Sequence, residues 1–177
     1  GPPSHVAIPV DQHGERTIVV ISDDKLDQVT VQGLSIHSDD IVCFVLWRNN
    51  FVADLDLAQK AGAITVVGSA ALTDPDVHHA DYLIGSREDF RGEYSVESAL
   101  KRFTHVVVTD GAEGATFYSA QSSIHQPAQP VDVVDTTGAG DAFLAGLLHY
   151  LAINKKIDKD AMALAARWSA LTVAAEG

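Results

Sequence analysis

Cysteine and basic residues are scarce in this 177-residue sequence. The single cysteine, Cys43, excludes a disulfide within the chain, and it lies inside the apolar run IVCFVLW, where we expect a small buried hydrophobic residue. The 12 basic residues are outnumbered by 24 acidic ones, which gives a formal net charge of −12. Because a surface of this sign repels polyanions, we expect neither nucleic acid nor an anionic membrane as a partner.

Long apolar runs are also missing. No stretch reaches the roughly 18 apolar residues that a membrane-spanning helix needs, and no signal-peptide pattern is visible. Together with the lone cysteine, these features predict a cytoplasmic protein. Hydrophobic residues still make up 46% of the sequence, which is enough for one domain with a substantial core.

The order of predicted elements points to an α/β fold. Two β-rich runs at 5–10 and 16–21 flank the loop DQHGE and predict a β-hairpin. Beyond the hairpin, the sequence predicts strands at 41–47, 63–68, 80–85, 105–109 and 131–134, and helices at 52–62, 95–103, 141–151 and 158–175. Apolar strands that alternate with helices predict a mainly parallel sheet covered on both faces. Ligands of such sheets bind beyond the carboxyl ends of the strands.

The stretch VDVVDTTGAGDAFLAG, residues 131–146, places an acid at the start of a predicted helix. The glycines allow a ligand to approach the backbone, and we expect free amides at Gly140, Asp141 and Ala142 to favour a negative charge. A phosphoryl group in transfer is such an anion, and Asp141 is placed to take a proton from an attacking hydroxyl group. The motif alone leaves a second interpretation open, in which Asp141 is an ordinary acid at a helix start.

Two other phosphate-binding motifs fit less well. A dinucleotide fingerprint needs a small residue where this sequence has Phe143, which argues against a dinucleotide oxidoreductase. The P-loop sequence G-K-[ST] is absent.

The string DTTGAGDAF resembles the C-terminal signature of the pfkB, or ribokinase-like, family of carbohydrate kinases. The resemblance implies a ribokinase-like three-layer αβα sandwich and transfer of the γ-phosphoryl group of ATP to a sugar hydroxyl, with Mg²⁺ as cofactor. It makes Asp141 the catalytic base, and Asp135, with Thr137, a candidate site for a monovalent cation such as K⁺. The resemblance implies an anion hole formed by the backbone of Thr137, Gly138, Ala139 and Gly140.

Other segments are similar to the family in the same order. VVVTDGAEG looks like the nucleotide loop, T-x-G-x-x-G, and the final helix looks like the segment that flanks the adenine. The resemblance thus implies nucleotide contacts by Thr109, Gly111, Gly114, Ala166 and Ser169. In the family motif N-x-x-E, Glu88 matches the acid that acts on the Mg²⁺–phosphate water network. Gly85 stands at the Asn position, which points to ketohexokinase-like and sulfofructose-kinase-like branches.

The resemblance also implies a division of the chain. Residues 4–22 would form a lid hairpin, which in the family covers the sugar and often makes a homodimer contact. Residues 23–177 would form a nucleotide-binding core, a fragment of a longer kinase domain. An alternative hypothesis is a truncated nucleotide-binding remnant without sugar-kinase turnover, acting as a regulatory or structural partner.

Overall fold

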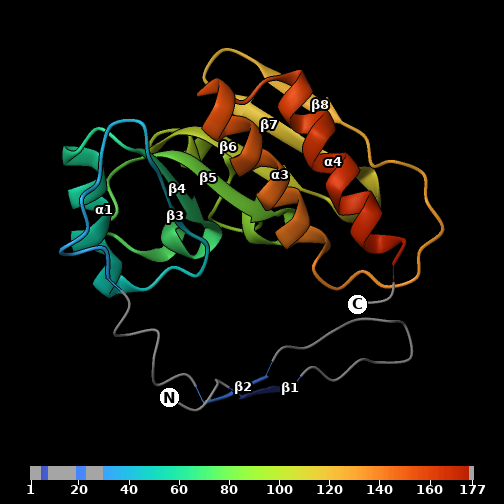
Figure 1. Cartoon of the computed structure of the whole chain (residues 1–177), viewed down its shortest axis with the longest axis horizontal. Coiled ribbons are helices and arrows are strands. Elements are labelled where there is room, and N and C mark those ends of the chain that lie inside the picture. Colours follow the sequence, from blue (N-terminus) through green and yellow to red (C-terminus); the bar gives the residue numbers. More distant parts are fainter. Residues whose placement is uncertain (1–4, 8–18, 23–29, 176–177) are drawn as a thin grey trace. The chain divides into compact units, whose positions relative to one another are not determined.

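The computed structural model describes residues 5–7, 19–22 and 30–175 (Figure 1). The chain divides into two compact units, residues 1–33 and residues 34–177. In the first unit, β1 (His5–Ala7) pairs antiparallel with β2 (Val19–Ser22). This pairing agrees with the predicted hairpin, while the other residues of its predicted strands, 8–10 and 16–18, lie outside the described residues. Its assignment as a lid stays a prediction.

The second unit contains a six-stranded sheet in the order β3-β4-β5-β6-β7-β8. The strands are β3 (Ile41–Phe44), β4 (Ile64–Gly68), β5 (Ala80–Ser86), β6 (Phe103–Thr109), β7 (Ala115–Ser119) and β8 (Ser123–Gln126). The first four are parallel, and β7 and β8 extend the sheet with antiparallel pairing. The predicted mainly parallel sheet is therefore confirmed.

Helices cover both faces of this sheet (Figure 1). They are α1 (Val52–Lys60), α2 (Val96–Ala99), α3 (Ala139–Asn154) and α4 (Lys159–Val173), with short 3-10 turns η2 (Asn49–Phe51), η3 (Ser69–Thr73), η4 (Arg87–Phe90) and η5 (Gly111–Glu113). Successive strand residues point to opposite faces. Val67 and Val106 thus pack in the α1 and α2 layer, and Val66 and Val107 in the layer of α3 and α4.

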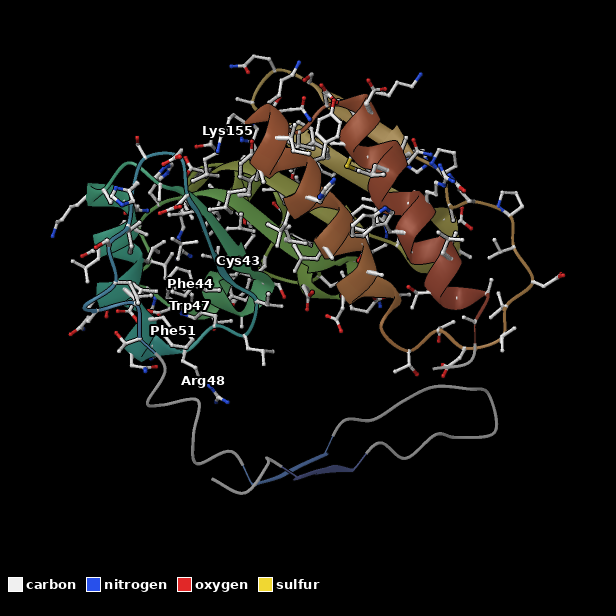
Figure 2. All side chains as sticks on the ribbon, in the orientation of Figure 1. Cys43, Phe44, Trp47, Arg48, Phe51 and Lys155 are labelled. Atoms are coloured by element: carbon white, nitrogen blue, oxygen red, sulfur yellow. The ribbon has the colours of Figure 1, made fainter. Side chains whose placement is uncertain are left out.

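Each layer has its own apolar core, which makes the unit a three-layer αβα sandwich. In the α1 layer, the rings of Phe44, Trp47 and Phe51 lie 5.5–6.2 Å apart and connect the end of β3 to the start of α1 (Figure 2). In the other layer, Leu147 of α3 and Met162 of α4 are fully buried. None of the helices in the described residues is long and apolar enough to cross a membrane.

Several predicted elements differ from the structure. The strand predicted at 41–47 ends at Phe44. The helix predicted at 95–103 is the short α2, because Phe103 is buried as the first residue of β6 and pairs with Ala80. Residues 131–134 form no strand; instead the amides of Val134 and Asp135 donate to the carbonyl of Val173 at the end of α4. The helix predicted at 141–151 begins two residues earlier and ends at Asn154.

Candidate functional site

A cleft of about 610 Å³ opens beside the carboxyl end of β6. Its walls come from the β6–β7 connection, the segment 128–136, the start of α3 and one face of α4. Most of its side chains are small or apolar. The residues that line it are Thr109, Gly111, Ala112, Gly114, Ala128, Gln129, Pro130, Val131, Val133, Thr136, Ala139, Gly140, Phe143, Ala166, Ser169, Ala170 and Val173. The cleft therefore brings together all five predicted nucleotide contacts and two residues of the predicted anion hole.

Residues 109–114, here called the nucleotide loop, form one wall of the cleft. The amide of Asp110 donates to Gly114 O at 2.8 Å, and the amide of Glu113 donates to Asp110 O at 2.9 Å, so the loop closes on itself. Gly111 and Gly114 have φ angles of +51° and +98°, a region that favours glycine. A Cβ atom at Gly114 would also lie 2.1 Å from Gln126 O, so position 114 has no room for a side chain.

Another wall contains the start of α3. Gly138 precedes the helix with φ +75°, and its carbonyl accepts the amide of Ala142 at 2.8 Å. The prediction of a free amide at Ala142 is therefore wrong, because this amide makes the first α-helical hydrogen bond. Within the described residues, the amides of Gly140 and Asp141 have no acceptor. These two donors, at the positive end of the helix dipole, leave the helix start able to bind an anion.

Asp141 follows Gly140 directly in the first turn of α3. Its side chain is exposed, and it makes no hydrogen bond or ion pair with other residues in the described part of the chain. Asp141 does not line the cleft, but its neighbour Gly140 does. A Cβ atom at Gly140 would meet nothing within 4 Å, so the backbone here is open to a ligand. The exposed carboxylate of Asp141 thus lies in the first turn of α3, next to the two amides without an acceptor.

Asp135 shapes the turn that leads into α3. One carboxylate oxygen accepts the amide of Thr137 at 2.8 Å and its hydroxyl at 2.7 Å. The hydroxyl oxygen of Thr137 keeps its lone pairs, so a carboxylate and a hydroxyl oxygen stand side by side. Such hard oxygen donors fit a hard cation.

Glu88 lies in η4, just beyond β5, and does not line the cleft. Its carboxylate is exposed and pairs with Arg91 at 3.1 Å. In the described residues, no three His, Cys, Asp or Glu side chains cluster closely enough to hold a metal ion.

The turn after β5 also contains an acid, Asp89, that the sequence motifs do not single out. Asp89 Oδ2 accepts the amide of Ser86 at 2.7 Å and its hydroxyl at 2.9 Å, which closes a capping box around η4. The S-x-x-D spacing was the signal that could have revealed it. A Cβ atom at Gly85 would lie 2.7 Å from Ser69 Cβ and 3.0 Å from Asp89 Oδ2. An asparagine at position 85 would therefore collide with Ser69 of η3 and crowd Asp89.

A second cavity of about 180 Å³ lies beside the ends of β3 and β4. It is lined by Cys43, Val45, Val66, Val67, Gly68, Ser69, Ile84 and Leu144. Burial raises the pKa of the Cys43 thiol to about 11, so this thiol stays protonated and unreactive near neutral pH. Cys43 is half-buried rather than fully buried as expected.

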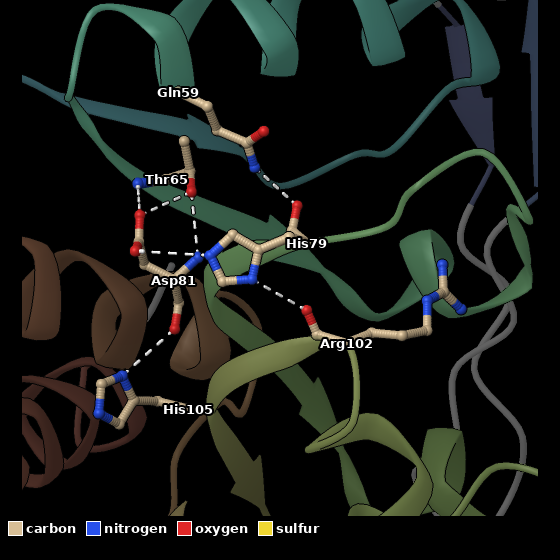
Figure 3. Close-up of polar contacts among 6 residues, drawn as sticks. All are labelled: Gln59, Thr65, His79, Asp81, Arg102 and His105. Carbon is tan, nitrogen blue, oxygen red and sulfur yellow. Dashed lines mark hydrogen bonds and ion pairs between the residues drawn. The ribbon is translucent and has the colours of Figure 1, made fainter.

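A polar network lies at the opposite ends of the strands (Figure 3). The Asp81 carboxylate accepts the amide and hydroxyl of Thr65, each at 2.8 Å, and the Asp81 carbonyl contacts His105 Nδ1 at 3.3 Å. The His105 ring stacks between Tyr82 and Phe117 at 4.8 and 5.2 Å. Burial lowers the His105 pKa, although its contacts with Asp81 oppose the shift. Since Thr65, Asp81 and His105 lie near the amino ends of their strands, the network supports the sheet far from the cleft.

The chain matches the sequence model of the pfkB family of carbohydrate kinases over residues 2–177. A fructokinase of Klebsiella pneumoniae is 28% identical over 216 aligned positions, which cover 98% of this chain and 68% of that protein. An aminoimidazole riboside kinase of Salmonella typhimurium is 54% identical over 46 residues, 26% of this chain and 14% of that protein. The structure of a Burkholderia thailandensis nucleoside kinase in complex with inosine has the same fold, with a TM-score of 0.80 at 21% identity. This match includes 98% of this chain and 62% of that protein. The chain thus spans about two thirds of the length of these two relatives, although nearly all of the chain itself is matched.

Proposed function

The chain belongs to the pfkB family of carbohydrate kinases, and we propose that it transfers the γ-phosphoryl group of ATP to a hydroxyl group of a sugar or a related small molecule. The observation that carries the proposal is the composition of the cleft. The nucleotide loop, one face of α4 and the start of α3 meet there, although they are widely separated in sequence. An apolar wall suited to a base and a helix start suited to phosphate are thus parts of one surface.

The proposed nucleotide lies along the cleft. Its base lies against the apolar wall that contains Ala166, with Ser169 as a polar contact, and its phosphates extend past the nucleotide loop toward α3. There the free amides of Gly140 and Asp141 stabilise the negative charge that spreads over the phosphoryl oxygens during transfer. Of the expected anion hole at 137–140, the amides of Thr137 and Ala139 already donate to Asp135 Oδ1 and Thr136 O, so the amides of Gly140 and Asp141 act as its donors.

Asp141 acts as the general base. The acceptor hydroxyl gives its proton to the Asp141 carboxylate while its oxygen forms a bond to the γ-phosphorus. The bond between this phosphorus and the β–γ bridging oxygen breaks, and ADP leaves with that oxygen. The exposed carboxylate of Asp141, without a hydrogen-bond partner in the described residues, supports this role.

Among the described residues, no charged side chain lines the cleft, and the whole chain carries a net charge of −12. Mg²⁺ bound to the nucleotide would neutralise the phosphates and stabilise the charge of the transition state. Glu88 would act on the water around this ion, and Asp135 with Thr137 would hold a monovalent cation beside the anion hole. The hairpin at 4–22 would cover the sugar and make a homodimer contact.

The experiment is an acceptor screen with a nucleotide-binding measurement beside it. Release of ADP from Mg·ATP is measured with fructose, ribose, other sugars and nucleosides, and calorimetry measures binding of Mg·ATP to the same protein. Release of ADP that depends on one acceptor supports the kinase. Binding of Mg·ATP without stimulation by any acceptor would instead favour the nucleotide-binding remnant that works as a regulatory or structural partner.

A further inference from the structure

An ion pair between Arg87 and Asp110 joins the ends of two neighbouring strands. β5 and β6 are paired up to Ser86 and Thr109, and each strand contributes its next residue to the ion pair. Arg87 Nε donates to Asp110 Oδ2. The side chain of Arg87 is 52% exposed and that of Asp110 is 29% exposed. The two residues are 23 positions apart in sequence, and no sequence motif connects them.

Asp110 is also the residue that closes the nucleotide loop. Its amide donates to Gly114 O and its carbonyl accepts from the amide of Glu113. The residues on either side of it, Thr109 and Gly111, both line the cleft. A displacement of Asp110 therefore moves this wall of the cleft.

Contacts with the end of β5 help to order the nucleotide loop. Its two glycines, Gly111 and Gly114, lose more conformational freedom on ordering than other residues would. The loop is tied to the end of β5 by the Arg87–Asp110 ion pair and by the Thr109 hydroxyl, which donates to Gly85 O at 3.4 Å. Contacts that order a loop before binding lower the conformational entropy that is lost when the ligand binds.

We propose that Arg87 is a positioning residue that, through Asp110, holds the nucleotide loop in the conformation that receives the nucleotide. The proposal rests on the proposed function, because it takes Mg·ATP as the ligand of the cleft. Arg87 acts on binding and not on the chemical step, so its loss weakens nucleotide affinity and leaves turnover of the bound nucleotide nearly unchanged.

The test measures the dissociation constant of Mg·ATP by calorimetry for the wild type, Arg87→Met, Asp110→Asn and the double variant. Partly exposed ion pairs are weak, so we expect each single variant to raise the Kd about three- to fivefold, with kcat within about twofold. The double variant should be no worse than either single one, because both remove the same interaction. Arg87→Lys should recover part of the affinity. The gap between wild type and Arg87→Met should narrow when NaCl rises from about 50 to about 500 mM.

Lys156→Met is the matched control. Lys156 pairs with Asp158 at 3.1 Å, with side chains 68% and 30% exposed, and neither residue lines the cleft. This variant should keep the wild-type Kd. The thermal unfolding transition of each variant is measured to check that the variant is folded.

The outcomes separate the two proposals. Wild-type Kd values in Arg87→Met and Asp110→Asn would overturn the positioning role while leaving the kinase proposal intact. Weaker binding in Arg87→Met together with unchanged or tighter binding in Asp110→Asn would also overturn it, because Arg87 would then contact the phosphates directly. A wild-type protein that binds no Mg·ATP at all would overturn the proposed function, and the positioning role with it.

Discussion

Gly114 lies against the carbonyl oxygen of Gln126 so closely that a Cβ atom at position 114 would be 2.1 Å from that oxygen. Position 114 also has φ +98°. Gly114→Ala should therefore lower the free energy of unfolding by about 1–3 kcal/mol and weaken Mg·ATP binding, because the nucleotide loop must shift away from β8. Chemical denaturation and calorimetry measure the two effects.

Gly140→Ala is the comparison for this variant. A Cβ atom at position 140 meets nothing within 4 Å, so the variant should keep its stability within about 0.5 kcal/mol. It should still weaken Mg·ATP binding, because the methyl group would occupy the approach to the free amide of Gly140. Equal stability losses in the two variants would contradict the crowding at Gly114.

Replacement of Asp141 separates catalysis from folding. Asp141→Asn removes the proton acceptor, so the rate of phosphoryl transfer to the identified acceptor should fall about 100-fold or more. The free energy of unfolding should change by less than about 0.5 kcal/mol, because the carboxylate is exposed and makes no hydrogen bond in the described residues. Asp132→Asn, an exposed acid of the preceding segment that does not line the cleft, should keep full activity. Activity of Asp141→Asn within tenfold of wild type would contradict its role as base.

The two neighbouring acids after β5 should respond in opposite ways. Glu88→Gln loses an exposed ion pair and should leave stability nearly unchanged, but it should raise the Mg²⁺ concentration needed for half-maximal activity. Asp89→Asn weakens the capping box with Ser86 and should cost about 1 kcal/mol of stability. Mg²⁺ titrations and denaturant unfolding on both variants test this. If Asp89→Asn alone shifted the Mg²⁺ dependence, the acid of the metal network would be Asp89 and not Glu88.

The strands could be predicted where their apolar residues are buried and a neighbouring strand also satisfies their backbone hydrogen bonds. The strands at β4, β5 and β6 are apolar on both faces because both faces are covered, so their sequence pattern is unambiguous. Val133 and Val134 favour a strand equally well, but they are 67% and 54% exposed. The amides of Val134 and Asp135 donate to Val173 O at the end of α4 and not to another strand. A segment with high β propensity therefore forms no strand when no neighbouring strand pairs with it.

The site was predictable where its residues are close in sequence. GAGD and the nucleotide loop are local motifs, since their chemistry comes from backbone turns of a few residues. The pairing of Arg87 with Asp110 depends on the parallel register of β5 and β6, which a sequence pattern does not specify. The hydrogen bond that uses the amide of Ala142 depends on where α3 begins, and helix ends are the least certain part of such predictions.

His105 should make stability depend on pH. Burial between Tyr82 and Phe117 lowers its pKa in the folded protein below the ordinary value of about 6.5. The unfolded chain therefore takes up a proton first as pH falls, and folding stability decreases from about pH 6.5 downward through the lower folded pKa. Above about pH 6.5 this residue contributes no pH dependence.

His105→Phe keeps a ring between Tyr82 and Phe117 but cannot be protonated. Its free energy of unfolding, measured by urea denaturation between about pH 5 and pH 8, should fall less steeply below about pH 6.5 than that of the wild type. Replacement of His78, an exposed histidine, by Gln serves as the control and should leave the wild-type slope. Two parallel curves for wild type and His105→Phe would mean that His105 titrates alike in the folded and unfolded chain, and that its burial does not shift its protonation.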